Sequence, residues 1–294
     1  MSEHEWLAEQ FDANRRHLQA VAYRMLGSLS EAEDAVQDAW LKVSRADVSA
    51  VGNLGGWLTT VVARVCLDML RARKARREES LGMQVPESIV HSDAAANPEQ
   101  EALLADSVGL ALLVVLDTLD PAERLAFVLH DMFGMPFDEI ASIVGRSPDA
   151  ARQLASRARR RVRGAATVPA SDLTRQREVA EAFLSALRGG DFEGLLAVLD
   201  PDVMVRVDAG AGAPGAPREI RGARTWAQGA LAFSSAVRFA QPALVNGTVG
   251  VVLARHGRLS RALRFTIRDG KIVEVDIVGD PTRLAQLEVA VLEH

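Results

Sequence analysis

The chain has 294 residues, of which 48% are hydrophobic and 25% are charged, and its formal net charge is −5. This is the composition of an ordinary globular protein, and the length predicts two or three domains. No apolar run approaches the roughly 20 residues that span a bilayer, and the N-terminus lacks the pattern of a signal peptide. Because Cys66 is the single cysteine and the six histidines are scattered, we expect a cytoplasmic protein with no internal disulfide, metal or cofactor.

Residues 5–77 form the first predicted helical block. In the segment 31–43, apolar residues recur at helical spacing and predict one buried helix face. The other face is acidic, and taken alone it is typical of a helix side that meets only water. This face carries Asp34, Gln37, Asp38 and Leu41.

The end of this block, residues 57–77, begins apolar and becomes basic. Between Arg64 and Arg77 there are six basic residues and one acidic residue, a net charge of +5. A helix of this kind can lie with its arginines along DNA phosphates. The segment 53–56, Asn-Leu-Gly-Gly, predicts an irregular loop before the helix, and such a loop can hold an unstacked base of single-stranded DNA.

Residues 78–98 are predicted to be a linker across open surface, because they hold two prolines, three serines and four acidic residues but no basic residue. Residues 99–164 form a second helical block. In it, Asp120 and Pro121 predict the cap and first position of a helix, with Glu123 at the capping-box position.

The segment 137–163 predicts a short helix, a tight turn and a second, strongly basic helix. Gly145 can adopt the left-handed conformation that ends the first helix, Ser147 can cap the second, and Pro148 suits its first position. Between Arg146 and Arg163 there are seven arginines and one aspartate, a net charge of +6. A helix-turn-helix whose second helix enters the DNA major groove needs this local charge, although a packed hairpin with a solvated basic face is the plainer alternative.

The pattern changes near residue 173, and residues 174–292 predict a separate domain with helices at 174–187, 192–199 and 221–233. A strand is predicted at 203–207, a loop at 208–217, and further strands at 243–245, 248–255, 259–268 and 271–278. Asn-Gly, His-Gly and Asp-Gly pairs between these strands indicate hairpin turns. With a final helix at 281–292, the pattern predicts an α+β cone in which helices pack on a curved antiparallel sheet.

Two basic elements joined by a linker, with an acidic helix beside the first, resemble the extracytoplasmic-function sigma factors, small promoter-recognition subunits of bacterial RNA polymerase. The resemblance covers residues 5–164 and rests on the segments 32–41, 56–64 and 119–148. It implies that residues 5–77 are region 2, an all-α domain that binds the β′ clamp helices of core polymerase and the −10 promoter element. Residues 99–164 would be region 4, the helix-turn-helix domain that binds the −35 element and touches the β flap.

The resemblance assigns roles to single residues. Polymerase binding falls to the acidic face described above, Asp34, Gln37, Asp38 and Leu41. For the −10 element, the resemblance assigns Asn53, Leu54 and Trp57 to a base pocket and Arg64, Arg71, Arg73 and Arg77 to the DNA backbone. A plain core role for Trp57 is an equal alternative. For the −35 element, the resemblance assigns base-edge contacts to Ser147, Asp149, Ala150, Gln153 and Arg157. It assigns phosphate contacts to Arg146, Arg152, Arg159 and Arg160.

The C-terminal half resembles a SnoaL-like domain of the nuclear-transport-factor-2 class, which the sigma-J-like branch of these sigma factors carries as a built-in regulator. The matching segments are 183–191, 203–212, 245–247 and 279–284. The linker keeps only part of the branch's motif, since the usual tryptophan is replaced at Gln84. The resemblance implies a regulatory domain with room for an unidentified small ligand, and the candidate regulatory residues are Pro86, Glu87, Asp208, Asp280 and Pro281.

Two alternatives stay open at this point. A one-component regulator would join the helix-turn-helix to a ligand-sensing domain, but it would not need the block at 31–77. An isomerase-like enzyme would use a buried acid of the cone, Asp208 or Asp276, to accept a proton. Because this half of the chain holds no tyrosine and its His256 falls in a turn, we expect a transcription initiation factor that is not an enzyme.

Overall fold

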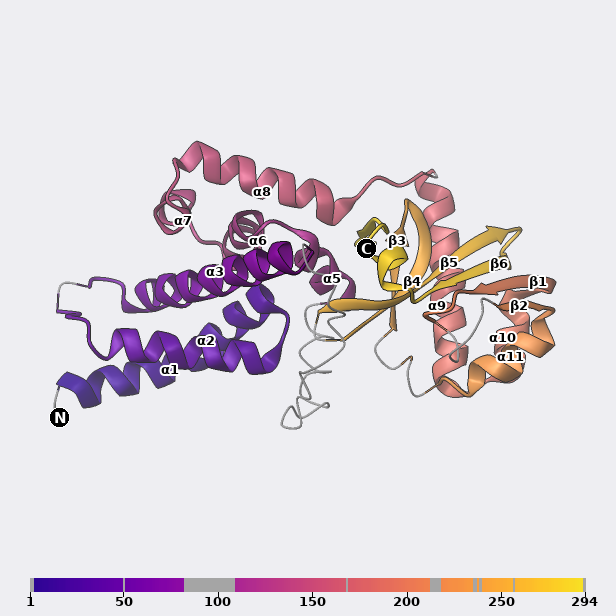
Figure 1. The fold of residues 1–294 in the computed structure, drawn as a ribbon, viewed down its shortest axis with the longest axis horizontal. Coiled ribbons are helices and arrows are strands. Elements are labelled where there is room, and N and C mark those ends of the chain that lie inside the picture. The colour runs from indigo at the N-terminus through magenta and orange to yellow at the C-terminus, as the bar shows by residue number, and fades with distance from the viewer. Residues whose placement is uncertain are drawn as a thin grey trace. The chain divides into compact units, whose positions relative to one another are not determined.

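The computed structural model describes residues 3–49, 51–81, 109–167, 169–211, 218–234, 237, 240–255 and 257–292 (Figure 1). The predicted linker at 78–98, with Pro86 and Glu87, lies outside the described residues apart from 78–81, which continue a helix. The chain divides into two units, one of residues 1–104 and 116–160 and one of residues 105–115 and 161–294.

Three long helices form the N-terminal part of the first unit: α1 (Glu3–Leu26), α2 (Leu29–Val43) and α3 (Leu54–Leu81). Apolar residues at helical spacing give each helix one buried face. The core therefore takes side chains from all three helices, and Leu18, Val36 and Val62 are examples. Cys66 of α3 is also fully buried there.

The loop before α3 is shorter than predicted, because Asn53 ends it as a helix cap. The Asn53 side-chain oxygen accepts a hydrogen bond of 3.0 Å from the Gly56 N–H, and the helix begins at Leu54. The prediction of an irregular loop over 53–56 is therefore wrong for its last three residues. They form the first helical turn, where a side-chain cap satisfies a backbone N–H that has no partner in the helix.

Further helices follow along the chain: α5 (Leu110–Thr118), α6 (Pro121–Phe127), the π-helical turn η1 (Val128–Met132), α7 (Phe137–Val144) and α8 (Pro148–Arg163). Gly145 ends α7 with a φ of 69°, and Ser147 caps α8 by accepting the Ala150 N–H at 3.2 Å, so both predictions are confirmed. Asp120 and Pro121 take the predicted cap and first position of α6, although the Asp120 side chain makes no cap hydrogen bond and its carboxylate binds Lys74 of α3.

The second unit is built on a seven-stranded sheet with the order β2-β1-β6-β5-β4-β3-β7. Its strands are β1 (Leu199–Val207), β2 (Arg218–Arg221), β3 (Ala240–Val245), β4 (Thr248–Arg255), β5 (Arg258–Arg268), β6 (Lys271–Val278) and β7 (Val289–Ala290). The prediction of a purely antiparallel sheet is wrong, because β1 runs parallel to β6. A parallel pair needs a long connection, and residues 208–270 supply it.

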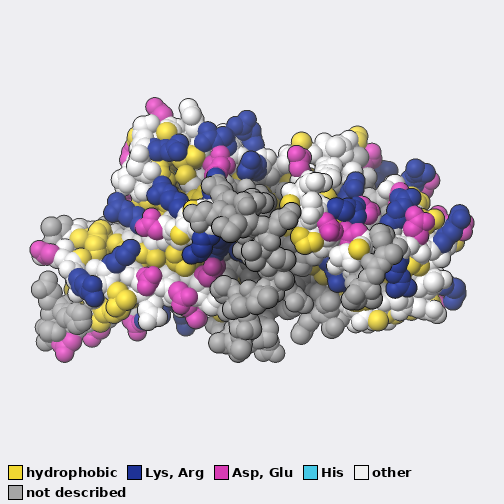
Figure 2. All heavy atoms as spheres, in the orientation of Figure 1, with side chains coloured by type: hydrophobic (Ala, Val, Ile, Leu, Met, Phe, Trp, Pro, Cys, Tyr) yellow, Lys and Arg dark blue, Asp and Glu magenta, His cyan; other side chains and the backbone are white. Residues whose placement is uncertain are grey.

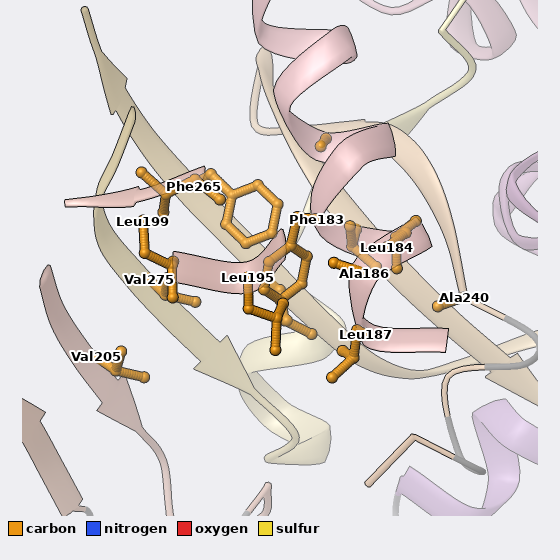
Figure 3. Packing of buried hydrophobic residues seen from close by; sticks show 14 of the residues in the cluster. Phe183, Leu184, Ala186, Leu187, Leu195, Leu199, Val205, Ala240, Phe265 and Val275 are labelled. Carbon is orange, nitrogen blue, oxygen red and sulfur yellow. The ribbon is translucent and has the colours of Figure 1, made fainter. Parts of the chain in front are cut away.

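Helices α9 (Ala170–Gly189), α10 (Phe192–Val198) and α11 (Ala223–Leu231) cover one face of this sheet. Figure 3 shows Phe183 of α9 beside Leu195 of α10 and Phe265 of β5. The Phe183 ring stacks on Trp226 of α11 with centroids 5.5 Å apart and meets Phe265 edge-on at 5.3 Å. The predicted α+β class is confirmed, and apolar side chains fill the space between helices and sheet.

The end of the chain differs from the predicted helix at 281–292. Helix α12 covers only Pro281–Leu284, and Val289–Ala290 pair with β3 as strand β7. The β-branched Val289 and Val291 of this segment favour an extended strand. Strand β2 was likewise not predicted.

The second unit also contains the start of α5 and the end of α8. The Gln241 side chain accepts the Ala111 N–H at 3.3 Å, and the Val162 carbonyl accepts the Val291 N–H at 2.8 Å. These bonds satisfy backbone groups near a helix start and a helix end, where intrahelical partners are missing. Among the described helices, none has the length and apolar character that a membrane crossing requires.

Candidate polymerase and DNA interfaces

The exposed side of α2 brings together the residues predicted to bind polymerase. The opposite side of the helix is buried, since Val36 and Val43 belong to the core. Leu41 is 49% exposed, which is unusual for a large apolar side chain in the described residues. An apolar side chain among polar neighbours has the composition of a small protein interface. The exposed set is Asp34, Gln37, Asp38 and Leu41.

The start of α3 carries the residues predicted to line the −10 base pocket. Asn53 is exposed and caps the helix, while Leu54 and Trp57 are half-buried. Trp57 therefore differs from its neighbour Leu58, which is fully buried in the core. The structure brings these three predicted residues together within one helical turn.

The arginines predicted to follow the −10 backbone do not all lie on open surface. Arg64 and Arg71 are exposed, and Arg71 lies 3.9 Å from Asp68 one turn before it. Arg73 is only 13% exposed, because it binds Glu31 of α2 and lies 3.8 Å from a second carboxylate described below. The side chain of Arg77 lies outside the described part of the structure.

Helix α8 carries the residues predicted to read the −35 element. Figure 2 shows Lys and Arg side chains gathered over this helix. The buried Ala151, Leu154, Ala155 and Ala158 recur at helical spacing and fix which side faces the core. Ala150 and Arg159 are half-buried, and the exposed residues are Arg146, Ser147, Asp149, Arg152, Gln153, Arg157 and Arg160.

Several of these side chains already have partners. Arg152 binds Asp149 on the same helix. Arg157 donates to the Glu123 carboxylate of α6 at 2.7 Å. Arg159 makes the same kind of contact with an acid of η1. That acid is Asp131, at 2.6 Å.

Three other predicted −35 residues have no such partner. Within the described part of the chain, Arg146, Gln153 and Arg160 make no hydrogen bond or ion pair through their side chains. All three are exposed. They are therefore available to a ligand, with arginine suited to phosphates and glutamine to a base edge.

Sequence reasoning missed Arg124 of α6, the largest fully buried side chain in the described structure. Its Nε and Nη2 atoms donate to the Arg24 carbonyl of α1 at 3.3 and 3.2 Å. Its Nη1 atom lies 3.7 Å from the Asp117 carboxylate, which is the second acid beside Arg73. We refer to Glu31, Arg73, Asp117 and Arg124 as the central ion network.

The central ion network joins α2 and α3 to α5 and α6, and its two positive and two negative charges balance. Burial lowers the pKa of Arg124 to about 10, against the attraction of Asp117, so the guanidinium stays charged at neutral pH. One sequence signal for this burial exists. Arg124 stands beside Leu125 and one helical turn before Val128, on an otherwise apolar face.

The second unit holds another buried charge, Asp208, which is a candidate regulator and the proton acceptor of the isomerase alternative. Its carboxylate receives five hydrogen bonds and joins the segments 203–212 and 279–284, both singled out by the resemblance. We refer to this arrangement as the Asp208 clasp. The donors are the N–H groups of Gly210, Ala211, Gly279 and Asp280 at 2.9–3.1 Å and the Arg283 guanidinium at 3.2 Å.

Asp280 and Pro281 build the short helix from which Arg283 reaches the clasp. The Asp280 side chain caps α12 by accepting the Arg283 N–H at 3.0 Å, and Pro281 takes the first helical position. Burial alone would raise the pKa of Asp208, but the N–H groups of its backbone donors and the Arg283 charge outweigh it, so this pKa is lowered. Asp208 is therefore held as a carboxylate.

A hollow of about 740 Å³ lies beside the clasp, on the polar side of the sheet. Three of its four arginines are paired: Arg206 binds Glu274, and Arg264 and Arg283 lie 3.4 and 3.1 Å from Asp276. Paired charges give it a polar lining, unlike the mostly apolar lining of typical small-molecule pockets. In the described residues, no group of His, Cys, Asp and Glu side chains is placed to hold a metal ion.

Two protein-family models match the helical part of the chain. Sigma-70 region 2 matches residues 10–76, and Sigma-70 region 4 matches residues 109–162. The acidic face of α2, the basic helix α3 and the helix-turn-helix α7–α8 fall within these matches. The fold and these surfaces define a transcription initiation factor of the RNA polymerase sigma class.

Relatives extend the similarity over both halves of the chain. SigJ of Mycobacterium tuberculosis, an ECF RNA polymerase sigma factor, is 36% identical over 289 residues, which cover 93% of this chain and 92% of SigJ. The probable ECF sigma factor SigI of the same organism is 34% identical over 290 residues, or 98% of each chain. The chain belongs to the extracytoplasmic-function RNA polymerase sigma factors, which confirms the resemblance and decides against a one-component regulator.

Solved structures similar to this chain include a sigma factor and an NTF2-like protein. The crystal structure of M. tuberculosis SigJ covers 95% of this chain and 98% of that chain, with 36% identity and a TM-score of 0.46. An NTF2-like protein from Burkholderia xenovorans covers 40% of this chain and 97% of that chain, with 19% identity and a TM-score of 0.27.

Proposed function

We propose that this sigma factor acts in the cytoplasm and binds the β′ clamp helices of core RNA polymerase through the exposed face of α2. The observation that carries the proposal is the grouping of three predicted polar residues on the same helix face as Leu41, whose apolar side chain is half exposed to solvent. Burying that side chain against a partner is favourable, by about 1 kcal/mol for half a leucine. The neighbouring carboxylates give the surface a charge that selects a basic partner.

In this proposal the start of α3 binds an unstacked base of the −10 element, and the exposed Arg64 and Arg71 follow its phosphates. Helix α8 enters the major groove at the −35 element. Gln153 then reads a base edge, while Arg146 and Arg160 contact the backbone. Region 4 also touches the β flap of the polymerase.

A further part of the proposal is that the chain makes no covalent bond. A catalytic base needs an accessible lone pair and a pKa close to the working pH. Asp208 offers neither, because five donors occupy its carboxylate and its pKa is lowered. Asp276 is held between Arg264 and Arg283 at 3.4 and 3.1 Å.

We infer that the fused C-terminal domain modulates promoter activity. Support comes from the second unit, where the sheet binds the backbone of Ala111 at the start of α5 and of Val162 near the end of α8. The domain thus bonds to two helices of region 4. Deleting residues 174–294 should change promoter-specific transcription with core polymerase, and unchanged activity would contradict a modulating role.

Polymerase binding is tested by capture of core enzyme on immobilised protein. Asp34→Ala with Asp38→Ala should reduce capture at least tenfold, since each lost charge at an interface typically weakens binding by about 1 kcal/mol or more. The matched control is Asp172→Ala with Glu178→Ala, which removes two exposed acids from α9. Equal capture by both double variants would place the polymerase surface elsewhere.

A further inference from the structure

The two DNA-reading helices α3 and α8 lie in one packed unit, apart from the last three residues of α8. A packed unit of about 150 residues is roughly 40 Å across. Elements centred at −10 and −35 lie about 25 base pairs apart, or roughly 85 Å along B-DNA. If the proposed function holds, on which this inference rests, region 2 and region 4 have to separate before both elements are bound.

Polar side chains link region 2 to region 4. Arg124 donates to the Arg24 carbonyl, and Lys74 of α3 binds Asp120 at the start of α6. An aromatic contact adds to them: the Phe133 ring meets His17 edge-on at 5.3 Å and lies 5.2 Å from the Arg24 guanidinium.

The two cations at this junction belong to the basic helix that is proposed to follow the −10 strand. Arg73 lies against Asp117, and its neighbour Lys74 binds Asp120. Both acids come from region 4. Carboxylates and phosphates are both anionic acceptors of charge-assisted hydrogen bonds, so DNA and these acids compete for the same two side chains.

The central ion network can divide without leaving a buried charge alone. Arg73 keeps Glu31 within region 2, and Arg124 keeps Asp117 within region 4. The link that has to break, between Arg73 and Asp117, is also the longest at 3.8 Å. Because an unpaired buried charge is strongly unfavourable, a network that separates into two neutral pairs allows reversible opening.

We propose that the carboxylates of Asp117 and Asp120 are an internal substitute for DNA phosphates. They hold Arg73 and Lys74 in a closed state until promoter phosphates take their place. The closed state is the free protein, and the open state has both cations on the −10 strand. Region 4 thereby inhibits DNA binding by region 2 until the two separate.

A distance measurement between the regions reports on the closed state. Spin labels on Arg16→Cys in α1 and Ser142→Cys in α7 occupy exposed sites, and the native Cys66 is buried away from the label. Asp120→Asn should raise the open fraction about two- to fivefold, the range expected for loss of one exposed ion pair. Asp117→Asn should shift it in the same direction, and it also removes the carboxylate beside the buried Arg124. The control Asp12→Asn removes an exposed acid that pairs only within α1.

Binding of a fluorescent −10 single strand gives the second readout. Asp120→Asn should tighten binding by the full-length protein about two- to fivefold, in step with the open fraction. The charge swap Lys74→Asp with Asp120→Lys should restore the closed distance yet bind the strand more weakly than the wild type. A merely stabilising ion pair would not couple these two readouts.

The outcomes separate this inference from the proposed function. If Asp120→Asn and Asp117→Asn match Asp12→Asn in both distance and DNA affinity, the internal substitute does not exist. If the polymerase holoenzyme with the wild-type chain fails to bind promoter DNA at all, the proposed function is wrong, and the distance data still decide whether the acids close the unit. Since Asp120 is an exposed residue, its variant keeps the test valid even if Asp117→Asn fails to fold.

Discussion

At the scale of residues, Arg124 and Asp208, two of the buried charged residues, are held in opposite ways. Arg124 spans two regions and relies on a carbonyl and a shared carboxylate. Asp208 lies within one domain, where backbone N–H groups surround it. A charge held mainly by backbone groups fixes local geometry, whereas a charge shared between regions can be exchanged for another partner.

Asp208→Asn should lower the free energy of unfolding of the second unit by about 2 kcal/mol at neutral pH, because the amide cannot accept all five hydrogen bonds. The folded pKa of Asp208 is lowered. This stability is therefore present above the unfolded value of about 4 and is lost as pH falls through the lowered pKa. Urea unfolding at neutral pH and below about pH 3 measures the change.

The control for this experiment is Asp202→Asn, an exposed acid on the neighbouring strand, which should unfold like the wild type. A difference between Asp208→Asn and the wild type that stays constant down to low pH would contradict the clasp. It would mean that the carboxylate charge contributes nothing to the fold.

Cys66 should resist alkylation in the folded protein. Burial raises the pKa of its thiol to about 12, so at pH 8 only about one molecule in ten thousand carries the reactive thiolate. Mass spectrometry after iodoacetamide treatment should show modification only after unfolding in guanidinium. Rapid alkylation of the native protein would show that α3 does not pack as described.

At the scale of elements, local signals predicted local structure. Gly145 and Ser147 define the turn between α7 and α8, and the Asn-Gly and Asp-Gly pairs define hairpins, because a short segment suffices to determine each. The parallel pairing of β1 with β6 and the pairing of Arg124 with the Arg24 carbonyl depend on residues far away in the chain, so no short pattern contains them. The candidate surfaces on α2 and α8 were predictable because helical periodicity records which side is buried.

Two residues of α8 should separate base reading from backbone binding. Gln153→Ala should weaken binding to the preferred −35 duplex about tenfold and leave non-specific DNA unaffected. Arg160→Ala should weaken binding to every sequence and lower the slope of log affinity against log salt by about one. Fluorescence anisotropy of the holoenzyme over a salt series measures both, and a uniform loss with Gln153→Ala would remove it from base recognition.

At the scale of the whole molecule, a chain of net charge −5 binds DNA in this account because its positive charge is concentrated on two narrow elements. Between 64 and 77 the net charge is +5, and between 146 and 163 it is +6. The rest of the chain is acidic, and two of its acidic residues, Asp117 and Asp120, contact the first basic element in the closed unit. Promoter binding is therefore expected to depend on polymerase and on opening of that unit.

The most direct measurement is run-off transcription by core RNA polymerase over a promoter library, with and without the protein. The account predicts transcripts from a subset of promoters that share −10 and −35 sequences. It also predicts loss of those transcripts with Asp34→Ala and Asp38→Ala, but not with Asp172→Ala and Glu178→Ala. Absence of promoter-specific transcripts with the wild-type protein, or their persistence with the α2 double variant, would contradict it.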